Sequence, residues 1–358
     1  MRLRSLTVAP LSVPTIDPFR IASGEVRATR SILVTATLEH DGRVATGLGE
    51  GACLPPVTIE DQPDALAAVE VAARRLAGAT FEGNDALLAV LDAALGATPV
   101  ARSAVEVAVL SAVASLGDLP LWRWLSGELT SPAPPIETDI TIPILEPARM
   151  ATLAREWWAR GFRRFKIKVG RDLASDLTAL EAMAAEAPRA QFQPDANAGL
   201  EPDEALAYVA AARARGLDVI CFEQPCATLA GLGVVSAALD IPVIADESLK
   251  TMADLEALFG VADGINLKIA KTGSMLRCLA IGRAARARGM PLMVGGMVET
   301  RLGMTAAAHL AAALGGVDFA DLDTAWLLAS DPFSGGYEAE GPIYRLLEAP
   351  GLGIAQRA

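Results

Sequence analysis

The chain has 358 residues, of which 52% are hydrophobic and 21% charged, so it can bury a large core and is too apolar to be disordered. Its 43 acidic residues outnumber its 31 lysines and arginines, giving a net charge of −12. This balance argues against a nucleic-acid partner, because phosphates require a basic surface. Anionic small molecules stay open as substrates, since a buried metal ion can reverse the field locally.

No targeting or membrane-spanning segment is predicted. Residues 1–14 lack the apolar core and the cleavage site of a signal peptide. No apolar stretch reaches the ~20 residues of a membrane span without charges, Pro or Gly. Four cysteines follow no metal or redox spacing, namely Cys53, Cys221, Cys226 and Cys278. We therefore expect a cytoplasmic protein with reduced thiols and no membrane partner.

The first 130 residues are typical of an α+β unit. Strands are predicted over residues 3–11 and 31–39, and Asp41-Gly42 is a tight turn into a return strand that ends at Gly49. Helical periodicity follows over residues 63–77, 84–95, 102–116 and 120–125. The Pro-rich run at residues 131–135 is predicted to be a linker.

Beyond the linker, over residues 131–323, short apolar strands alternate with helices. The strands are predicted to end near Ile142, Val169, Asp195, Glu223, Asp246, Lys268, Gly295 and Asp323. The helices between them include residues 148–160, 173–186, 203–215 and 274–288. Eight evenly spaced strands with intervening helices predict an α/β fold of the parallel TIM-barrel type. A doubly wound open sheet is the alternative, but no Gly-rich phosphate loop follows the first strand. Residues 324–358 are expected to fold back on the first unit.

Lysines occupy two of the predicted strands. Strand alternation places Lys166 and Lys168 on one face, opposite Phe165 and Ile167, so both lysines point into the barrel. Alone, this pattern would also fit a solvated edge strand. The sixth strand delivers Lys268 from the opposite wall, and the nearby Lys271 is expected to lie outside the pocket.

Three successive strands end in carboxylates: Asp195, Glu223 and Asp246. Each alone could be a helix cap. Together, at the carboxyl ends of adjacent strands, they would repel one another in a low-dielectric cavity unless a cation joined them. Oxygen ligands of this kind favour Mg²⁺, with Mn²⁺ as a substitute.

Lysines on both sides of a metal predict a proton transfer. A substrate carboxylate on the metal would lose electron density, which acidifies its α-proton. One neutral lysine would take that proton and the opposite ammonium would return one to the other face, inverting the carbon. The eighth strand adds Asp321 and Asp323 on one inward face. These fit either a capping Asp with a solvated neighbour or the recognition of a substrate ammonium.

In this order, these residues resemble the muconate-lactonising branch of the enolase superfamily. The resemblance implies a modified (β/α)₇β barrel from about residue 136 to 323, a capping domain over residues 1–130, and a tail that returns to the cap. It implies that Asp195, Glu223 and Asp246 bind one Mg²⁺. It also implies that Lys168 and Lys268 are the paired acid/base catalysts, with Lys166 as a helper.

Within that branch, Asp321-Leu322-Asp323 and the run Gly-Gly-Met-Val-Glu-Thr at residues 295–300 resemble the dipeptide epimerases. The resemblance implies that the two aspartates hold the dipeptide's ammonium while its C-terminal residue is inverted. Further substrate contacts are expected at Met297, Gly24 and Thr138, and a homo-oligomer is an open option. A mandelate-racemase pattern does not fit, because neither His40 nor His309 ends the seventh strand.

The cap loops are expected to select the side chains, over residues 20–29 and 51–61. Ala-Glu epimerases carry an Arg near the position of Gly24, where this chain has small and apolar residues with Arg20 and Arg27 at some distance. We therefore expect hydrophobic or mixed dipeptides rather than strictly Ala-Glu. The acidic pair Glu60 and Asp61 would leave a cationic side chain as the second choice.

Two other readings stay open. One is another two-lysine enzyme, namely N-acylamino acid racemase, o-succinylbenzoate synthase or muconate cycloisomerase. Those substrates lack a free ammonium for Asp321 and Asp323. The other is a non-catalytic binding protein on the same scaffold, which the intact lysines and carboxylates disfavour.

Overall fold

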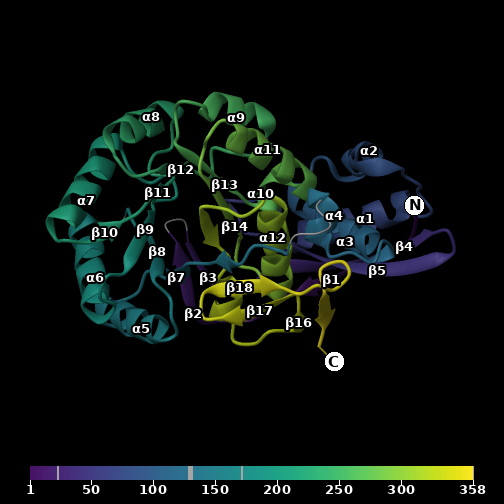
Figure 1. Cartoon of the computed structure of the whole chain (residues 1–358), viewed down its shortest axis with the longest axis horizontal. Helices are drawn as coiled ribbons and strands as arrows, with labels where there is room; N and C mark the ends of the chain where they lie inside the picture. The colour runs from purple at the N-terminus through teal and green to yellow at the C-terminus, as the bar shows by residue number, and fades with distance from the viewer. Residues whose placement is uncertain (22–23, 128–131, 171, 358) are drawn as a thin grey trace.

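The computed structural model describes residues 1–21, 24–127, 132–170 and 172–357 (Figure 1). Its amino-terminal elements are β1 (Arg2–Leu11), β2 (Pro14–Ile21), β3 (Gly24–Ala28), β4 (Ser31–His40), β5 (Arg43–Ala52), α1 (Gln62–Leu76), α2 (Gly83–Leu95), α3 (Pro99–Leu116) and α4 (Leu121–Ser126). The next are β6 (Ile136–Glu137), β7 (Ile140–Ile142), α5 (Pro147–Ala159), β8 (Arg164–Lys168), α6 (Leu173–Glu186), β9 (Gln191–Asp195), α7 (Pro202–Ala214), β10 (Asp218–Val219), β11 (Phe222–Glu223), α8 (Leu229–Ala238), β12 (Val243–Ala245) and α9 (Met252–Leu258). The last are β13 (Gly264–Leu267), α10 (Ile269–Thr272), α11 (Met275–Ala287), β14 (Leu292–Gly295), α12 (Arg301–Ala313), β15 (Phe319–Asp321), the 3₁₀ helix η1 (Thr324–Leu327), β16 (Phe333–Gly335), β17 (Tyr337–Glu340), β18 (Ile343–Leu346) and β19 (Ile354–Gln356).

The amino-terminal unit is built on the antiparallel sheet β1-β4-β5. Helix α3 lies flat on β5 because two glycines clear the way. A Cβ on Gly47 would stand 2.1 Å from the Ala108 carbonyl oxygen, and one on Gly49 would stand 2.1 Å from that of Ala104. By length and composition α3 could cross a membrane, but 89% of it is buried inside the protein, as in the core helix of a folded domain.

A second hairpin, β2-β3, was not predicted from the sequence. It pairs Phe19 with Val26 and has an irregular register towards Pro14. Prolines at positions 14 and 18 interrupt the strand pattern, since proline cannot donate to a β-ladder. The hairpin matters because Phe19 lines the candidate site described below.

The predicted barrel is confirmed. Eight parallel strands follow the order β15-β14-β13-β12-β11-β9-β8-β7, with the short β10 beside β9, and helices surround them (Figure 1). Across the seam between the first and last strands, the Asp139 N–H donates to the Ala320 carbonyl at 2.9 Å. The Leu322 N–H donates to the Thr138 hydroxyl at 2.8 Å. The barrel is therefore nearly closed.

Buried carboxylates lock the amino-terminal unit to the barrel helices. Glu50 of β5 accepts bonds from the N–H groups of Thr300 and Gly303 at the start of α12. Glu106 of α3 accepts from Ser274 Oγ and the Leu276 N–H at the start of α11. Helix N-termini favour negative charge, so each contact satisfies free N–H groups and holds the two units in place.

The C-terminal residues contact both units. Strands β17 and β18 form a sheet with β6, next to the barrel. The Leu121 N–H donates to the Gly351 carbonyl at 2.7 Å, and the Leu352 N–H donates to Ser111 Oγ at 3.2 Å. The segment therefore bridges α3, α4 and the barrel.

Candidate active site

The polar residues at the carboxyl ends of the barrel strands share one level. In the parallel register, Lys168 of β8 pairs with Asp195 of β9, and Asp195 pairs with Glu223 of β11. Asp246 directly follows β12 and Lys268 directly follows β13. Lys166 and Lys168 line the catalytic cavity, whereas the alternating Phe165 and Ile167 belong to the hydrophobic core. The alternation predicted from the sequence therefore holds in β8.

Ammonium groups bridge the three predicted metal ligands. Lys166 Nζ lies 3.2 Å from Asp195 Oδ2 and 2.7 Å from Glu223 Oε2. Lys168 Nζ lies 2.5 Å from the same Asp195 oxygen. Lys268 Nζ lies 2.8 Å from Asp246 Oδ2 and 3.9 Å from Glu223 Oε1. Positive charge thus already stands between each neighbouring pair of carboxylates.

The same contacts shift the pKa values of the carboxyls. Burial disfavours the charged form of Asp195, but Lys168 and Lys166 outweigh it and lower the pKa to about 2. Burial is likewise outweighed at Asp246, where Lys268 and Lys271 hold the pKa below its usual range. At Glu223, burial and the neighbouring Asp195 raise the pKa to about 7. Of the three carboxylates, Glu223 is therefore the one whose negative charge is least compensated by the nearby lysines.

These residues fit a divalent cation. Three buried carboxylates from adjacent strands offer only oxygen atoms, which hard cations prefer. The ammonium groups that bridge them mark where a cation is electrostatically favoured. The raised pKa of Glu223 indicates that the lysines alone do not satisfy the set.

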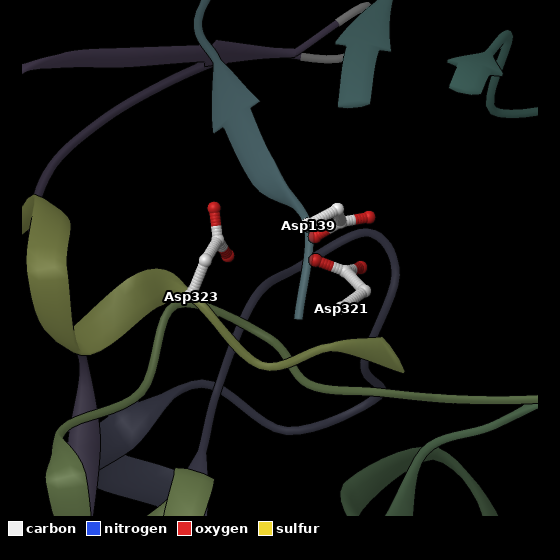
Figure 2. A group of neighbouring side chains, drawn as sticks. All are labelled: Asp139, Asp321 and Asp323. Atoms are coloured by element: carbon white, nitrogen blue, oxygen red, sulfur yellow. The ribbon is translucent and has the colours of Figure 1, made fainter. Parts of the chain in front are cut away.

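A second carboxylate group lies beside the first. Oxygen atoms of Asp139, Asp321 and Asp323 all lie within 4.8 Å of one another, and all three side chains are buried. Figure 2 shows Asp139 and Asp321 close together, with Asp323 to one side. Burial and the charge of Asp321 raise the pKa of Asp139 well above its usual range and that of Asp323 to about 7. This cluster, too, could hold a cation.

Polar contacts satisfy the second group only in part. Gln193 donates to Asp139 Oδ2 at 2.5 Å, and the Thr141 N–H donates to Asp323 Oδ2. The remaining oxygens, Asp139 Oδ1 and Asp323 Oδ1, are buried without a hydrogen-bond partner among the described residues. Unpartnered buried acceptors are costly, so a positive charge near this group would stabilise it. Of the three carboxylates, Asp321 lines the cavity, whereas Asp139 and Asp323 do not.

Of the other predicted substrate contacts, Met297 lies in the site. It lines the cavity with Lys166, Lys168 and Lys268, and it packs against Leu54 and Val57 of the cap. Thr138 does not line this cavity, because its hydroxyl is used in the barrel seam. Thr141, three residues further along the chain and within β7, lines it instead.

The cap loop near Gly24 is only partly described. Gly24 begins β3, but residues 22 and 23 and the side chain of Arg20 lie outside the described residues. The Arg27 guanidinium pairs with Glu25 at 2.6 Å and is 74% exposed. It therefore does not line the cavity.

Sequence reasoning missed several residues around the site. Lys271 does not line the cavity, as expected, but it is buried with Nζ 2.5 Å from Asp246 Oδ1 and 3.0 Å from the Asn266 carbonyl. Asn266 Nδ2 donates to Glu223 Oε1 at 2.9 Å. Asp139 was missed as well. Asp139 directly precedes the apolar strand β7, and this position is the feature of the sequence that could have indicated it.

Buried lysines and carboxylates thus gather at the carboxyl edge of the barrel, where TIM-barrel enzymes carry their active sites. The similarity of the chain to known proteins identifies its family. Residues 149–357 match the family described as enolase C-terminal domain-like. The chain belongs to this family, in the branch of mandelate racemase and muconate-lactonising enzymes.

Relatives of established name cover nearly the whole chain. It is 38% identical over 352 residues to L-Ala-D/L-amino acid epimerase of Populus trichocarpa, across 96% of this chain and 82% of that protein. It is 36% identical over 359 residues to aromatic dipeptide epimerase of Herpetosiphon aurantiacus, across 98% of each.

Solved structures are equally similar. The substrate-liganded L-Ala-D/L-Glu epimerase of Bacillus subtilis matches with a TM-score of 0.93 at 33% identity, over 100% of both chains. The dipeptide epimerase of Enterococcus faecalis, complexed with Mg and L-Leu-L-Tyr, matches with a TM-score of 0.90 at 30% identity, over 99% of this chain and 100% of that one.

Proposed function

We propose that the protein is a Mg²⁺-dependent dipeptide epimerase that inverts the α-carbon of the C-terminal residue. The observation that carries this proposal is the joining of two buried carboxylate groups by one ammonium, Lys166. One group suits a cation that binds the substrate carboxylate, and the other suits the substrate's own ammonium. The names of the Populus and Herpetosiphon relatives and the Enterococcus complex with Mg and a dipeptide support it.

Asp195, Glu223 and Asp246 would hold the Mg²⁺. When bound, the ion would withdraw charge from the substrate carboxylate and so acidify the neighbouring C–H. Lys166, held by Glu223 and Asp321, is placed to hydrogen-bond that carboxylate and keep it in plane. Burial opposes its charge, but the surrounding carboxylates raise the pKa of Lys166 well above its usual range, so it stays an ammonium.

Lys168 and Lys268 flank the metal ligands. They come from β8 and from the end of β13, at opposite ends of the arc of strands that carries Asp195, Glu223 and Asp246. One lysine, neutral, would remove the α-proton. The other, as an ammonium, would deliver a proton to the opposite face. No net proton is gained, and the stereocentre is inverted.

The second carboxylate group distinguishes a dipeptide from an acylated amino acid. Asp321 lines the cavity and could pair with an ammonium directly, whereas Asp139 and Asp323 are fully buried outside the cavity lining and would add negative charge at short range. An acylated nitrogen carries no positive charge to meet this group. The described cysteines are all free and buried, which suits the reducing cytoplasm we propose as its location.

The test is solvent deuterium uptake at the C-terminal α-carbon across a library of L,L-dipeptides, measured by mass spectrometry with Mg²⁺ present. We expect uptake that produces both epimers. Absence of uptake from every dipeptide, with exchange of N-acylated amino acids instead, would assign the chain to the racemase alternative. No exchange in either set would favour a binding protein.

A further inference from the structure

The catalytic cavity is too small for a dipeptide. Its volume is about 40 Å³, and one water molecule needs roughly 10–15 Å³ of such space. A second cavity of about 220 Å³ lies next to it, between the β2 strand of the cap, α5 and η1. Phe19 and Thr141 line both cavities, so the two share a wall. A larger cavity of about 680 Å³ also borders the catalytic cavity, at Lys168, so volume alone does not select the side on which a substrate's first side chain would lie.

The shared wall lies at the ammonium end of the site. Thr141 donates its N–H to Asp323, one of the carboxylates that would meet the substrate's ammonium. In a dipeptide the ammonium and the first side chain are attached to the same carbon. A substrate held by Asp321 and Asp323 would thus project its first side chain from this point, next to Thr141 and Phe19.

The inner wall of the second cavity is apolar and aromatic. Phe19, Leu153 and Trp157 are buried, and Trp326 and Leu327 complete the wall. The Arg160 guanidinium stacks over Trp157 at 4.1 Å and over Trp326 at 4.6 Å, which holds both rings in place.

The charges at this cavity are balanced. Arg149 of α5 pairs with Asp17 of β2 at 2.7 Å, and the lining as a whole carries two arginines, Arg149 and Arg160, and two carboxylates, Asp17 and Glu156. A charged ligand group would find no excess of either sign here, whereas an apolar group would be desolvated by the aromatic wall.

From these features we infer that this cavity is the subsite for the substrate's N-terminal side chain, and that it selects large aliphatic or aromatic residues. The inference rests on the proposed dipeptide epimerase activity and adds the class of the first residue. Leu153 is a specificity-determining residue in this arrangement, because its side chain forms part of the inner wall.

The test compares kcat/KM for deuterium uptake by the wild-type protein on Gly-L-Leu, L-Ala-L-Leu, L-Leu-L-Leu, L-Phe-L-Leu, L-Glu-L-Leu and L-Lys-L-Leu. Each methylene buried is worth about fourfold, so we expect Leu and Phe in first position to exceed Gly by at least about tenfold. Leu153→Trp should fill the cavity and remove most of the preference for Leu and Phe over Gly in first position. Arg155→Trp, on an exposed position of the same helix that does not line the cavity, is the control and should keep the preference.

Each outcome bears on the inference. Equal turnover of Gly-L-Leu and L-Leu-L-Leu by the wild type overturns it, whatever Leu153→Trp does. A tenfold preference for Glu or Lys in first position also overturns it, since the subsite would then be polar. If no dipeptide takes up deuterium, the proposed function fails first, which is a distinct result from loss of the first-residue preference.

Discussion

Lys166 Nζ lies 2.7 Å from Asp321 Oδ2 and, on its other side, 2.7 Å from Glu223 Oε2. One buried ammonium therefore links the carboxylates suited to a metal with those suited to a substrate ammonium. A change in charge at either group will be felt at the other through Lys166.

The first prediction concerns Mg²⁺. Asp246→Asn should abolish epimerisation and weaken Mg²⁺ binding measured by calorimetry, because it removes a charged ligand from the set. Lys271 would still be held by the carbonyls of Asp246 and Asn266, so we expect the circular dichroism spectrum to stay unchanged. Asp323→Asn, in the second group, is the matched control and should keep Mg²⁺ affinity.

Two outcomes would contradict this prediction. If Asp323→Asn loses the ion while Asp246→Asn binds it normally, the metal belongs to the Asp139–Asp321–Asp323 cluster. Full activity after exhaustive chelation would rule out the metal altogether.

The second prediction concerns the two lysines. Lys168→Ala and Lys268→Ala should each abolish epimerisation. Each variant should still exchange the α-proton of one stereoisomer, and the two should differ in which one, because the lysines approach from opposite ends of the metal ligands. Proton NMR in D₂O with L,L- and L,D-dipeptides reads this directly. A variant that epimerises at the wild-type rate would show that the replaced lysine is no catalyst.

The third prediction concerns the ammonium. N-acetylated dipeptides should be poor substrates, since the cluster of Asp139, Asp321 and Asp323 would be buried without its cation. Leaving a buried charge unpaired costs on the order of 3–5 kcal/mol, which is several hundredfold or more in kcat/KM. Asp323→Asn should narrow the gap between free and acetylated forms. Equal turnover of both forms by the wild type would point to an acylamino acid racemase.

Much of the site was predictable because strand geometry is regular. The alternation around Lys166 and Lys168 indicates which side chains face inward, and barrel topology places Asp195 and Glu223 at the same edge. The contact of Lys271 with Asp246 was not predictable. The short helix α10 returns its side chain beneath the strand ends, a tertiary path that periodicity does not encode.

Thr138 and Thr141 illustrate a second limit. Thr138 precedes the first barrel strand and Thr141 lies in it. The sequence alone does not indicate which of the two hydrogen-bonds across the seam that closes the barrel. The Thr138 hydroxyl hydrogen-bonds across the seam with β15, and Thr141 lines the cavity.

The acidic cap residues are also used elsewhere. Glu60 accepts hydrogen bonds from the N–H groups of Val100 and Ala101 at the start of α3. Asp61 pairs with Arg30 at 2.6 Å. Neither lines the cavity, so the expected preference for a cationic side chain as second choice loses its basis.

The fourth prediction is a pH dependence of stability centred on His309. This side chain is fully buried on α12 and accepts the Trp122 N–H at Nδ1, and burial lowers its pKa to about 3. The unfolded chain would take up a proton near pH 6.5, whereas the folded protein would not. His309 therefore does not reduce the free energy of unfolding above about pH 6.5. As the pH falls, the unfolded chain gains a proton that the folded protein does not, so the free energy of unfolding decreases, by roughly 2 kcal/mol at about pH 5.

Denaturant unfolding at several pH values checks this prediction, with His309→Asn as the comparison. The Asn amide oxygen can accept the Trp122 N–H but does not titrate, so the difference in unfolding free energy between the two proteins should shrink from about pH 7 to about pH 5. The comparison isolates His309, because every other titrating group is present in both proteins. Glu299 is one such group, and it acts in the opposite sense. Burial and the nearby Glu50 raise the pKa of Glu299 to about 8, so its contribution to stability falls as the pH rises. A difference that is constant with pH would contradict the assignment.

The last prediction concerns the C-terminal side chain of the dipeptide. Met297 is buried against Leu54 and Val57, so the cap and the end of the seventh barrel strand present an apolar surface to the cavity that holds the lysines. A hydrophobic side chain here gains about 0.8 kcal/mol for each buried methylene, and a glutamate would lose hydration without a described cationic partner on this surface. We expect kcat/KM for L-Ala-L-Leu and L-Ala-L-Phe to exceed that for L-Ala-L-Glu by about tenfold, or ~1.4 kcal/mol. Val57→Ser should reduce this preference. Ile59→Ser, on the same loop but 77% exposed, should leave it unchanged. If L-Ala-L-Glu wins by a similar margin, a cation must reach its carboxylate from the cap, and Arg20 and Arg27 are then the residues to replace.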